Sequence, residues 1–395
     1  MVIINVKIKS MADRDSECGF VRCEDGIFTQ TGDMSEYRER SGEEVIDGSG
    51  LTMYPGFIDA HCHIGMWNDS LCFEGEDGNE DTDPSTPHLR AIDSVNPMDR
   101  CFEDAVSAGV TSVCTGVGSA NPIGGSFIIM KTWGSKRVDD LIVKSPAAIK
   151  FALGENPKNT YNDRDETPVT RMATAAIIRE QLIKAHRYRD DLAEYHRLKG
   201  TDDEISLPEL DMKCEALLPL FDAEKPLKAH FHCHRADDIF TAIRISREFG
   251  LDYVLVHCTD GALISEELAQ DKPSLTIGPI FGDRGKPELA HHDISTPAVL
   301  ARQGLKFALC TDHPETPIQY LPLTAALAVR GGLSREEALR CITVNAAETL
   351  GISDRAGTIE CGKDADFTLF SGDPLDMMSL PELVVIRGRT AFRRQ

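Results

Sequence analysis

Long hydrophobic runs are absent from this sequence. Nowhere in its 395 residues does an apolar stretch approach the roughly 18 residues needed to span a bilayer. The N-terminal residues 1–7, Met-Val-Ile-Ile-Asn-Val-Lys, are typical of a short strand and not of a secretion signal. We therefore expect a cytoplasmic protein with no membrane partner.

Basic side chains are few beside the acidic ones. The 42 Lys and Arg residues face 64 Asp and Glu residues, for a formal net charge of -22. Such a charge repels phosphate backbones, so nucleic acid is not an expected partner. The twelve cysteines fit a reducing compartment. Five of them lie in apolar strand runs without paired spacing and are expected to be buried free thiols: Cys62, Cys114, Cys233, Cys258 and Cys310. There is also no internal repeat and no low-complexity segment.

The pattern of apolar residues divides the chain into three segments. Residues 1–53 hold short strand-like runs punctuated by glycine, too little to form a core alone. Residues 54–355 alternate apolar strands with helical stretches, the pattern of a parallel sheet with crossover helices. Residues 356–395 return to turns and short strands. We expect 1–53 and 356–395 to pair as a small β-sandwich domain beside the large α/β domain.

The large segment contains eight candidate strands. They lie at residues 56–63, 110–115, 126–131, 148–154, 227–234, 253–258, 275–278 and 307–312. Between them, Thr167 followed by proline and Ser334 followed by Glu337 are typical helix starts, and the charged residues 187–204 suggest an exposed helical insertion. Eight strand–helix units predict a closed (β/α)8 TIM barrel, in which functional residues sit at the C-terminal ends of the strands.

Histidines and an aspartate recur at such strand ends. His61 and His63 lie two residues apart, so their side chains point the same way and can bind one metal ion. His257 and Asp312 end two later apolar runs. Imidazole and carboxylate are the ligands expected for zinc and similar divalent ions. The sequence therefore predicts a metal site at the mouth of the barrel.

The fifth candidate strand carries three histidines on one face, His230, His232 and His234. They cannot all be equivalent ligands, because they lie at different depths. We favour His232, since His230 would lie deeper in the barrel and His234 would face the substrate. An assignment shifted by one pleat is the alternative.

A further ligand is expected from the strand at residues 148–154. A site with two metal ions needs a bridging anion, which a glutamate or a carbamylated lysine can supply. Strand alternation points Lys150 into the barrel, whereas Glu155 lies at the strand end, where Gly154 can reset the pleat. Both residues stay candidates.

With these residues the chain resembles the amidohydrolase superfamily, in particular its imidazolonepropionase-like and prolidase-like branch. The resemblance rests on Pro-Gly-Phe-Ile-Asp-Ala-His-Cys-His at 55–63, the later histidines, Thr-Asp-His-Pro at 311–314, Thr-Val-Asn-Ala-Ala at 343–347 and Gly-Lys-Asp-Ala-Asp at 362–366. It implies a metal-bearing barrel that hydrolyses amide or other carbon–nitrogen bonds of small molecules. It also implies one or two divalent ions, zinc first, on His61, His63, His232, His257 and Asp312, with Lys150 or Glu155 bridging.

In the expected reaction the metal activates water, Asp312 acts as general base and His234 polarises the carbonyl. Arg235 and Arg284 are candidates for pairing with a substrate carboxylate. One alternative is a deaminase of a ring amidine, but the His-x-x-Glu usual there is replaced by Arg-Ala-Asp-Asp at 235–238. An imidazolonepropionase proper is a narrower form of the main hypothesis. A noncatalytic scaffold would have lost ligands, and none is missing. A homo-oligomer is compatible with the sequence.

Overall fold

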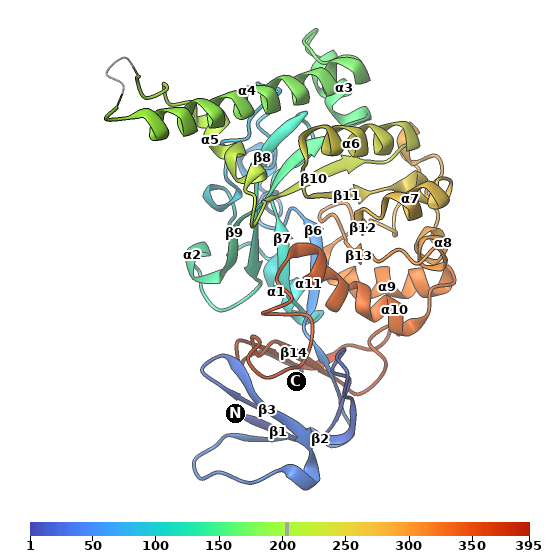
Figure 1. Cartoon of the computed structure of the whole chain (residues 1–395). Coiled ribbons are helices and arrows are strands. Elements are labelled where there is room, and N and C mark those ends of the chain that lie inside the picture. Colours follow the sequence, from blue (N-terminus) through green and yellow to red (C-terminus); the bar gives the residue numbers. More distant parts are fainter. Residues whose placement is uncertain (202–204) are drawn as a thin grey trace.

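The large unit is built on one eight-stranded sheet. The computed structural model describes residues 1–201 and 205–395 (Figure 1). The strands of this sheet pair in sequence order from β6 to β13. Their bounds are β6 (Phe57–Cys62), β7 (Val110–Thr115), β8 (Ile123–Lys131), β9 (Ile142–Ala152), β10 (Lys228–Cys233), β11 (Tyr253–His257), β12 (Ser274–Ile277) and β13 (Ala308–Leu309). All eight expected strands are confirmed.

The sheet is nearly closed into a barrel at β13 and β6. The backbone N–H of Asp312 donates to the carbonyl of His61 at 3.1 Å, and the N–H of His63 donates to the carbonyl of His313 at 2.9 Å. These bonds lie at the C-terminal ends of the two strands. Closure therefore brings the two ends of the barrel sequence together at its mouth.

The barrel departs from the regular (β/α)8 pattern at β8. This strand runs antiparallel to both β7 and β9, whereas the other neighbouring pairs are parallel. The connections on either side of β8 span only residues 116–122 and 132–141, and the second holds just the short α2 (Val138–Leu141). A parallel crossover needs about a dozen residues or more, so these connections can only reverse the chain.

Helices cover the outside of the barrel. Beside α2 they are α1 (Cys101–Ser107), α3 (Glu155–Asn162), α4 (Arg171–Leu198), α5 (Met212–Leu217), α6 (Ala236–Phe249), α7 (Ser265–Asp271), α8 (Thr296–Arg302), α9 (Leu321–Arg330), α10 (Arg335–Cys341) and α11 (Val344–Leu350). The long α4 extends past the barrel (Figure 1) and contains most of the expected insertion, of which residues 202–204 lie outside the described residues. Among the described residues, no helix has both the length and the apolar character to cross a membrane.

The two expected helix starts had different outcomes. Ser334 accepts from the N–H of Glu337 in a capping box at the start of α10, as predicted. The prediction at Thr167 is wrong by three residues, because the N-cap of α4 is Thr170, whose side chain accepts from the N–H of Ala173. Thr170 has extended backbone directly before the first helical residue, Arg171, which is the position from which a side chain can cap the helix.

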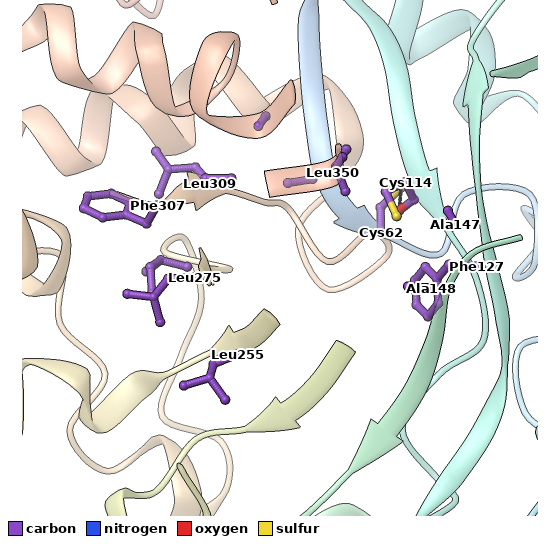
Figure 2. Packing of buried hydrophobic residues seen from close by; sticks show 14 of the residues in the cluster. Cys62, Cys114, Phe127, Ala147, Ala148, Leu255, Leu275, Phe307, Leu309 and Leu350 are labelled. Carbon is purple, nitrogen blue, oxygen red and sulfur yellow. Dashed lines mark hydrogen bonds between the residues drawn. The ribbon is translucent and has the colours of Figure 1, made fainter. Parts of the chain in front are cut away.

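The two faces of the barrel sheet differ in chemistry. Figure 2 shows Leu255, Leu275 and Leu309 beside one another on neighbouring strands, and all three belong to the apolar core that the strands share with the helices. Leu255 pairs directly with Leu275, so both lie on this outer face. The inner face carries the polar residues, since His230 pairs directly with Lys150. The alternation expected for Lys150 is thus confirmed.

Both ends of the chain contribute to a second sheet. Its order is β16-β15-β14-β5-β1-β2-β3, with β4 paired to β1. The bounds are β1 (Val2–Ile8), β2 (Ser16–Glu24), β3 (Ile27–Asp33), β4 (Val45–Asp47), β5 (Thr52–Pro55), β14 (Phe367–Phe370), β15 (Pro381–Ile386) and β16 (Arg389–Arg393). The expected pairing of the termini is confirmed, but the sandwich is not, because hydrogen bonding joins all eight strands in one sheet.

Candidate metal centre at the mouth of the barrel

The first group of candidate ligands lies where β6 and β13 meet. His61 is in β6, His63 follows it, and Asp312 follows β13. Asp312 Oδ1 lies 3.2 Å from His63 Nε2 and 3.6 Å from His61 Nε2. One ligand atom from each residue lies within 4.8 Å of the others. This spacing is compact enough for one metal ion.

A fully buried carboxylate that the sequence analysis missed holds this group in place. Asp59 accepts from the hydroxyl of Thr311 at 2.5 Å, from the N–H of Thr311 at 3.2 Å and from the N–H of His61 at 3.2 Å. Asp312, which follows Thr311 in the chain, has a φ of 55°. Left-handed backbone at a non-glycine residue costs about 1–3 kcal/mol and persists where surrounding bonds impose it. The hydrogen bonds to Asp59 thus fix the backbone segment that positions the Asp312 side chain.

The second group consists of His232, His234 and His257, again within 4.8 Å of one another. The ring of His257 lies 4.6 Å from that of His232 and 4.5 Å from that of His234, between centroids. The register pairs Val256 with His232 and His257 with Cys233, so strict alternation would turn His257 to the outer face. Its φ of 77° breaks the alternation and turns the ring inward. His234, expected to face the substrate, joins the ligand group.

His230 lies one pleat deeper than His232 on the same strand. Its ring centroid is 6.3 Å from that of His61 and 5.7 Å from that of Phe127. Burial and the nearby charge of Lys150 lower the pKa of His230 to about 3. It therefore lies below the two groups, at the depth that the pleat predicted.

Lys150 and Glu155, the two candidates for a bridge, lie in different surroundings. The Nζ of Lys150 is 3.1 Å from His61 Nε2 and 5.5 Å from the centroid of the Phe127 ring. Burial lowers the pKa of Lys150 to about 8, which favours the neutral amine needed for carbamylation. Glu155 instead begins α3, and its carboxylate accepts from the N–H of Glu288 at 3.2 Å. Of the two, only Lys150 contacts the first ligand group.

The protonation of the imidazoles suits metal binding. Burial lowers the pKa of His61, His232 and His234 well below its usual value, and that of His257 to about 4, so the rings are neutral near pH 7. The Nδ1 atoms of His63 and His257 lie 2.7 Å from the carbonyls of Gly116 and Gly278. Donating there leaves each Nε2 as a free acceptor, the usual arrangement of a ligating histidine.

Several buried polar atoms at these groups are also unsatisfied. Within the described part of the chain, His61 Nδ1, His234 Nε2 and His257 Nε2 have no hydrogen-bond partner. Leaving a buried polar atom unpaired costs about 1–3 kcal/mol. Neutral imidazoles, a carboxylate and unpaired lone pairs together match the donor set of a divalent ion such as zinc.

A cavity of about 470 Å³ opens above the two groups. His63, His232, His234 and Asp312 reach it from below, and the loops add a wall that includes Trp67, Asn79, Asn156, Asn159 and Lys286. The Trp67 ring packs against His63 with 5.2 Å between centroids. The candidate ligands are thus accessible to a small molecule.

Neither arginine predicted to bind substrate lies in the wall of this cavity. The guanidinium of Arg235 donates to the carboxylate of Asp237 at 2.9 and 3.1 Å, and that of Arg284 donates to the carbonyl of His292 at 2.7 Å. Both side chains are thus engaged by near neighbours in sequence. The cation of the same loop that does reach the cavity is Lys286, which the sequence analysis passed over in favour of Arg284.

Glu288, which follows Lys286 by two residues, was also missed. Its side chain is almost completely buried, and its Oε1 lies 3.7 Å from His232 Nε2 and 3.6 Å from His234 Nε2. No local signal distinguishes this glutamate from the other acidic residues of the polar loops. Only the path of the loop after β12 brings it to the histidines.

The chain matches the model of the amidohydrolase family over residues 52–390. It is 31% identical over 400 residues to "Amidohydrolase tasK" of Hapsidospora irregularis, covering 95% of this chain but 40% of that relative. It is 26% identical over 388 residues to the imidazolonepropionase of Phocaeicola vulgatus, covering 90% of this chain and 86% of the relative. It thus spans less than half the length of the first of these relatives.

Among solved structures, an amidohydrolase from Thermotoga maritima MSB8 superimposes with a TM-score of 0.93 at 40% identity, covering 100% of both chains. The resemblance seen in the sequence motifs is thereby confirmed. The chain belongs to the amidohydrolase family.

Proposed function

We propose that this protein is a metal-dependent hydrolase that uses water to cleave an amide or cyclic amide bond of a small molecule. The observation that carries the proposal is the convergence of two buried ligand groups, drawn from strands far apart in sequence, beneath one open cavity of about 470 Å³. A structural role would not need ligands that face a cavity.

The residues best suited to hold the metal are His61, His63 and Asp312, with Lys150 beside them, and His232 and His257 across the mouth. Zinc is the ion that this donor set matches best. When bound, a divalent ion lowers the pKa of water and polarises a carbonyl oxygen.

Asp312 is the proposed general base. Burial alone raises its pKa, but the neighbouring imidazoles of His257 and His63 outweigh that effect and hold the pKa well below its usual value. The ionised carboxylate faces the cavity, where it accepts a proton from the attacking water and returns it to the leaving nitrogen as the carbon–nitrogen bond breaks. His234, whose Nδ1 lies 2.8 Å from the hydroxyl of Thr259, is held in a fixed orientation toward the same space.

An imidazolonepropionase is the narrower candidate. The full-length match to a relative of that name favours it. The polar cavity wall, with Lys286 and the amides of Asn156 and Asn159, suits a small polar ring. A spectrophotometric assay with that substrate tests this candidate directly.

We further infer a division into 1–53 and 356–395 as the small domain and 54–355 as the barrel. All twelve cysteines are free in the described chain, which supports a reducing compartment such as the cytoplasm. The expected partner is a small-molecule substrate, and self-association is to be tested by measuring the molar mass in solution.

The proposal is tested by metal analysis of the purified protein together with a screen of dipeptides, N-acyl amino acids and cyclic amides. We expect at least one bound divalent ion per chain and turnover that falls by about 100-fold or more in Asp312→Asn, because the base is lost. The exposed Asp93, which pairs with Arg90, supplies the control Asp93→Asn. Turnover that survives Asp312→Asn would contradict the assignment.

A further inference from the structure

Glu288 is a buried carboxylate that lies beside the second ligand group. It lies in the short helical turn Pro287–Leu289 after β12, and its side chain is 1% exposed. Its Oε1 has no hydrogen-bond partner of proper geometry among the described residues. A buried carboxylate oxygen without a donor is costly unless a cation faces it. A cation is therefore expected at Oε1, and in this structure the ammonium of Lys286 lies 3.1 Å from it.

The position of Glu288 is set by a reciprocal contact with Glu155. The N–H of Glu155 donates to Glu288 Oε2 at 3.1 Å, and the N–H of Glu288 donates to the carboxylate of Glu155 at 3.2 Å. Gly154 permits this approach, since a Cβ there would lie 3.0 Å from Glu288 Oε2. With Oε2 held by the backbone, Oε1 is left pointing at His232 and His234.

The distances at Oε1 match those between two ligands of one metal ion. It lies 3.7 Å from His232 Nε2 and 3.6 Å from His234 Nε2. Tetrahedral zinc with bonds of about 2.0–2.1 Å places its ligands about 3.4 Å apart. The Asp312 carboxylate stands at 3.2 and 3.6 Å from the histidines of the first group, so the two carboxylates are related to their histidines in the same way.

We propose that Glu288 is a metal ligand, completing a site with His232, His234 and His257. The inference rests on the metal dependence proposed above and adds a ligand from outside the motifs of the sequence. This site has three imidazoles within 4.8 Å of one another and a carboxylate beside two of them. These are the four donors of a closed zinc site, whereas His61, His63 and Asp312 offer three and leave a position for water.

Lys286 competes with the metal for the same oxygen. Its Nζ lies 3.1 Å from Glu288 Oε1 and donates to Asn156 Oδ1 at 3.0 Å, while its side chain is 36% exposed. A flexible, partly exposed lysine can leave Glu288 and keep its contact with Asn156. We therefore expect Lys286 to balance the carboxylate in the metal-free protein and to turn toward the cavity when the metal is bound.

The test is zinc titration of metal-free protein by calorimetry, with zinc content counted by mass spectrometry. We expect two equivalents in the wild type and, in Glu288→Gln, one equivalent weakened by at least about tenfold, the lower end of losses seen around metal ligands. Glu155→Gln is the matched control, since it removes an equal charge from the residue in contact with Glu288 but leaves Glu288 intact. It should keep both equivalents.

Two results would overturn the inference. One is wild-type zinc stoichiometry and affinity in Glu288→Gln, and the other is the same loss in both variants, which would assign the effect to the Glu155 contact alone. A crystal structure of the zinc-loaded wild type, which needs no variant to fold, must show a Glu288 oxygen at about 2.0–2.2 Å from the zinc held by the three histidines. A wild type that binds no zinc, manganese or nickel would refute the metal-dependent function as well, which separates the two failures.

Discussion

Replacement of Lys131 by methionine should severely weaken the junction between the barrel and the small sheet. Lys131 ends β8 with 0% of its side chain exposed, and its Nζ lies 2.9 Å from Asp364 Oδ2 and in contact with Asp366 Oδ2. The hydroxyl of Ser112 accepts from it at 3.3 Å. One buried cation thus neutralises two carboxylates that lie just before β14.

The expected magnitude follows from what Lys131→Met leaves behind. Asp364 keeps its pair of bonds from Arg355 at 2.9 and 3.1 Å. Among the described residues, Asp366, with 5% of its side chain exposed, keeps only the N–H of Arg387 as a donor, at 2.8 Å. Removal of one partner of a buried ion pair costs about 3–5 kcal/mol, because the remaining charge is uncompensated. We expect a loss of that size in the free energy of unfolding.

Urea denaturation followed by circular dichroism measures this loss, and a second substitution identifies its cause. If the uncompensated carboxylate is responsible, adding Asp366→Asn to Lys131→Met should restore part of the stability, since it removes the unpaired charge. A loss below about 1 kcal/mol in Lys131→Met, or a double variant less stable than the single one, would refute the reasoning.

Three further predictions concern pH, packing and metal. Burial of Asp364 raises its pKa, but the charge of Lys131 outweighs this effect and holds the pKa of the folded protein below 3.8. The stabilisation by ionised Asp364 is therefore complete above pH 3.8 and is lost as the pH falls through the lower pKa of the folded protein. Below about pH 4 the Tm of the wild type should fall more steeply than that of Asp364→Asn. Gly78→Ala would place a Cβ 1.9 Å from the Trp67 ring and so displace a cavity wall, raising KM, whereas Gly282→Ala, with open space around it, should leave KM unchanged. Zinc at about 100 times its Kd should stabilise the chelated protein by about 2.7 kcal/mol, and a Tm indifferent to zinc would contradict the metal site.

The positions of the strands, and the face of the sheet to which each side chain points, followed from the local sequence wherever the strand is regular. The pleat has a period of two residues, so the alternation that turned Lys150 inward also placed His230 and His232 on the inner face. The motif containing His61 and His63 likewise needed no tertiary information. The amidohydrolase resemblance was carried by such short runs at strand ends, which is why the family match confirmed it.

The reversal of β8 and the inward turn of His257 did not follow from alternation. An apolar strand reads the same in either direction, so only the short connections around β8 exclude a parallel crossover. By strand alternation His257 would face outward, and its left-handed backbone turns the side chain to the inner face. Such a conformation is imposed by surrounding contacts and not by the residue's own preference.

Tertiary structure alone decided which loop residues meet above the strands. Arg235 and Glu155 were reasonable candidates by position, yet Arg235 is held by its neighbour Asp237 and Glu155 by the backbone of Glu288. Glu288 and Lys286 had no local signal and arrive at the histidines through the path of the loop after β12. The amino-acid sequence by itself determined the strands and their inward faces, because pleating is local. The occupants of the barrel mouth depend on closure and loop paths, which bring together residues more than a hundred positions apart, such as Glu155 and Glu288.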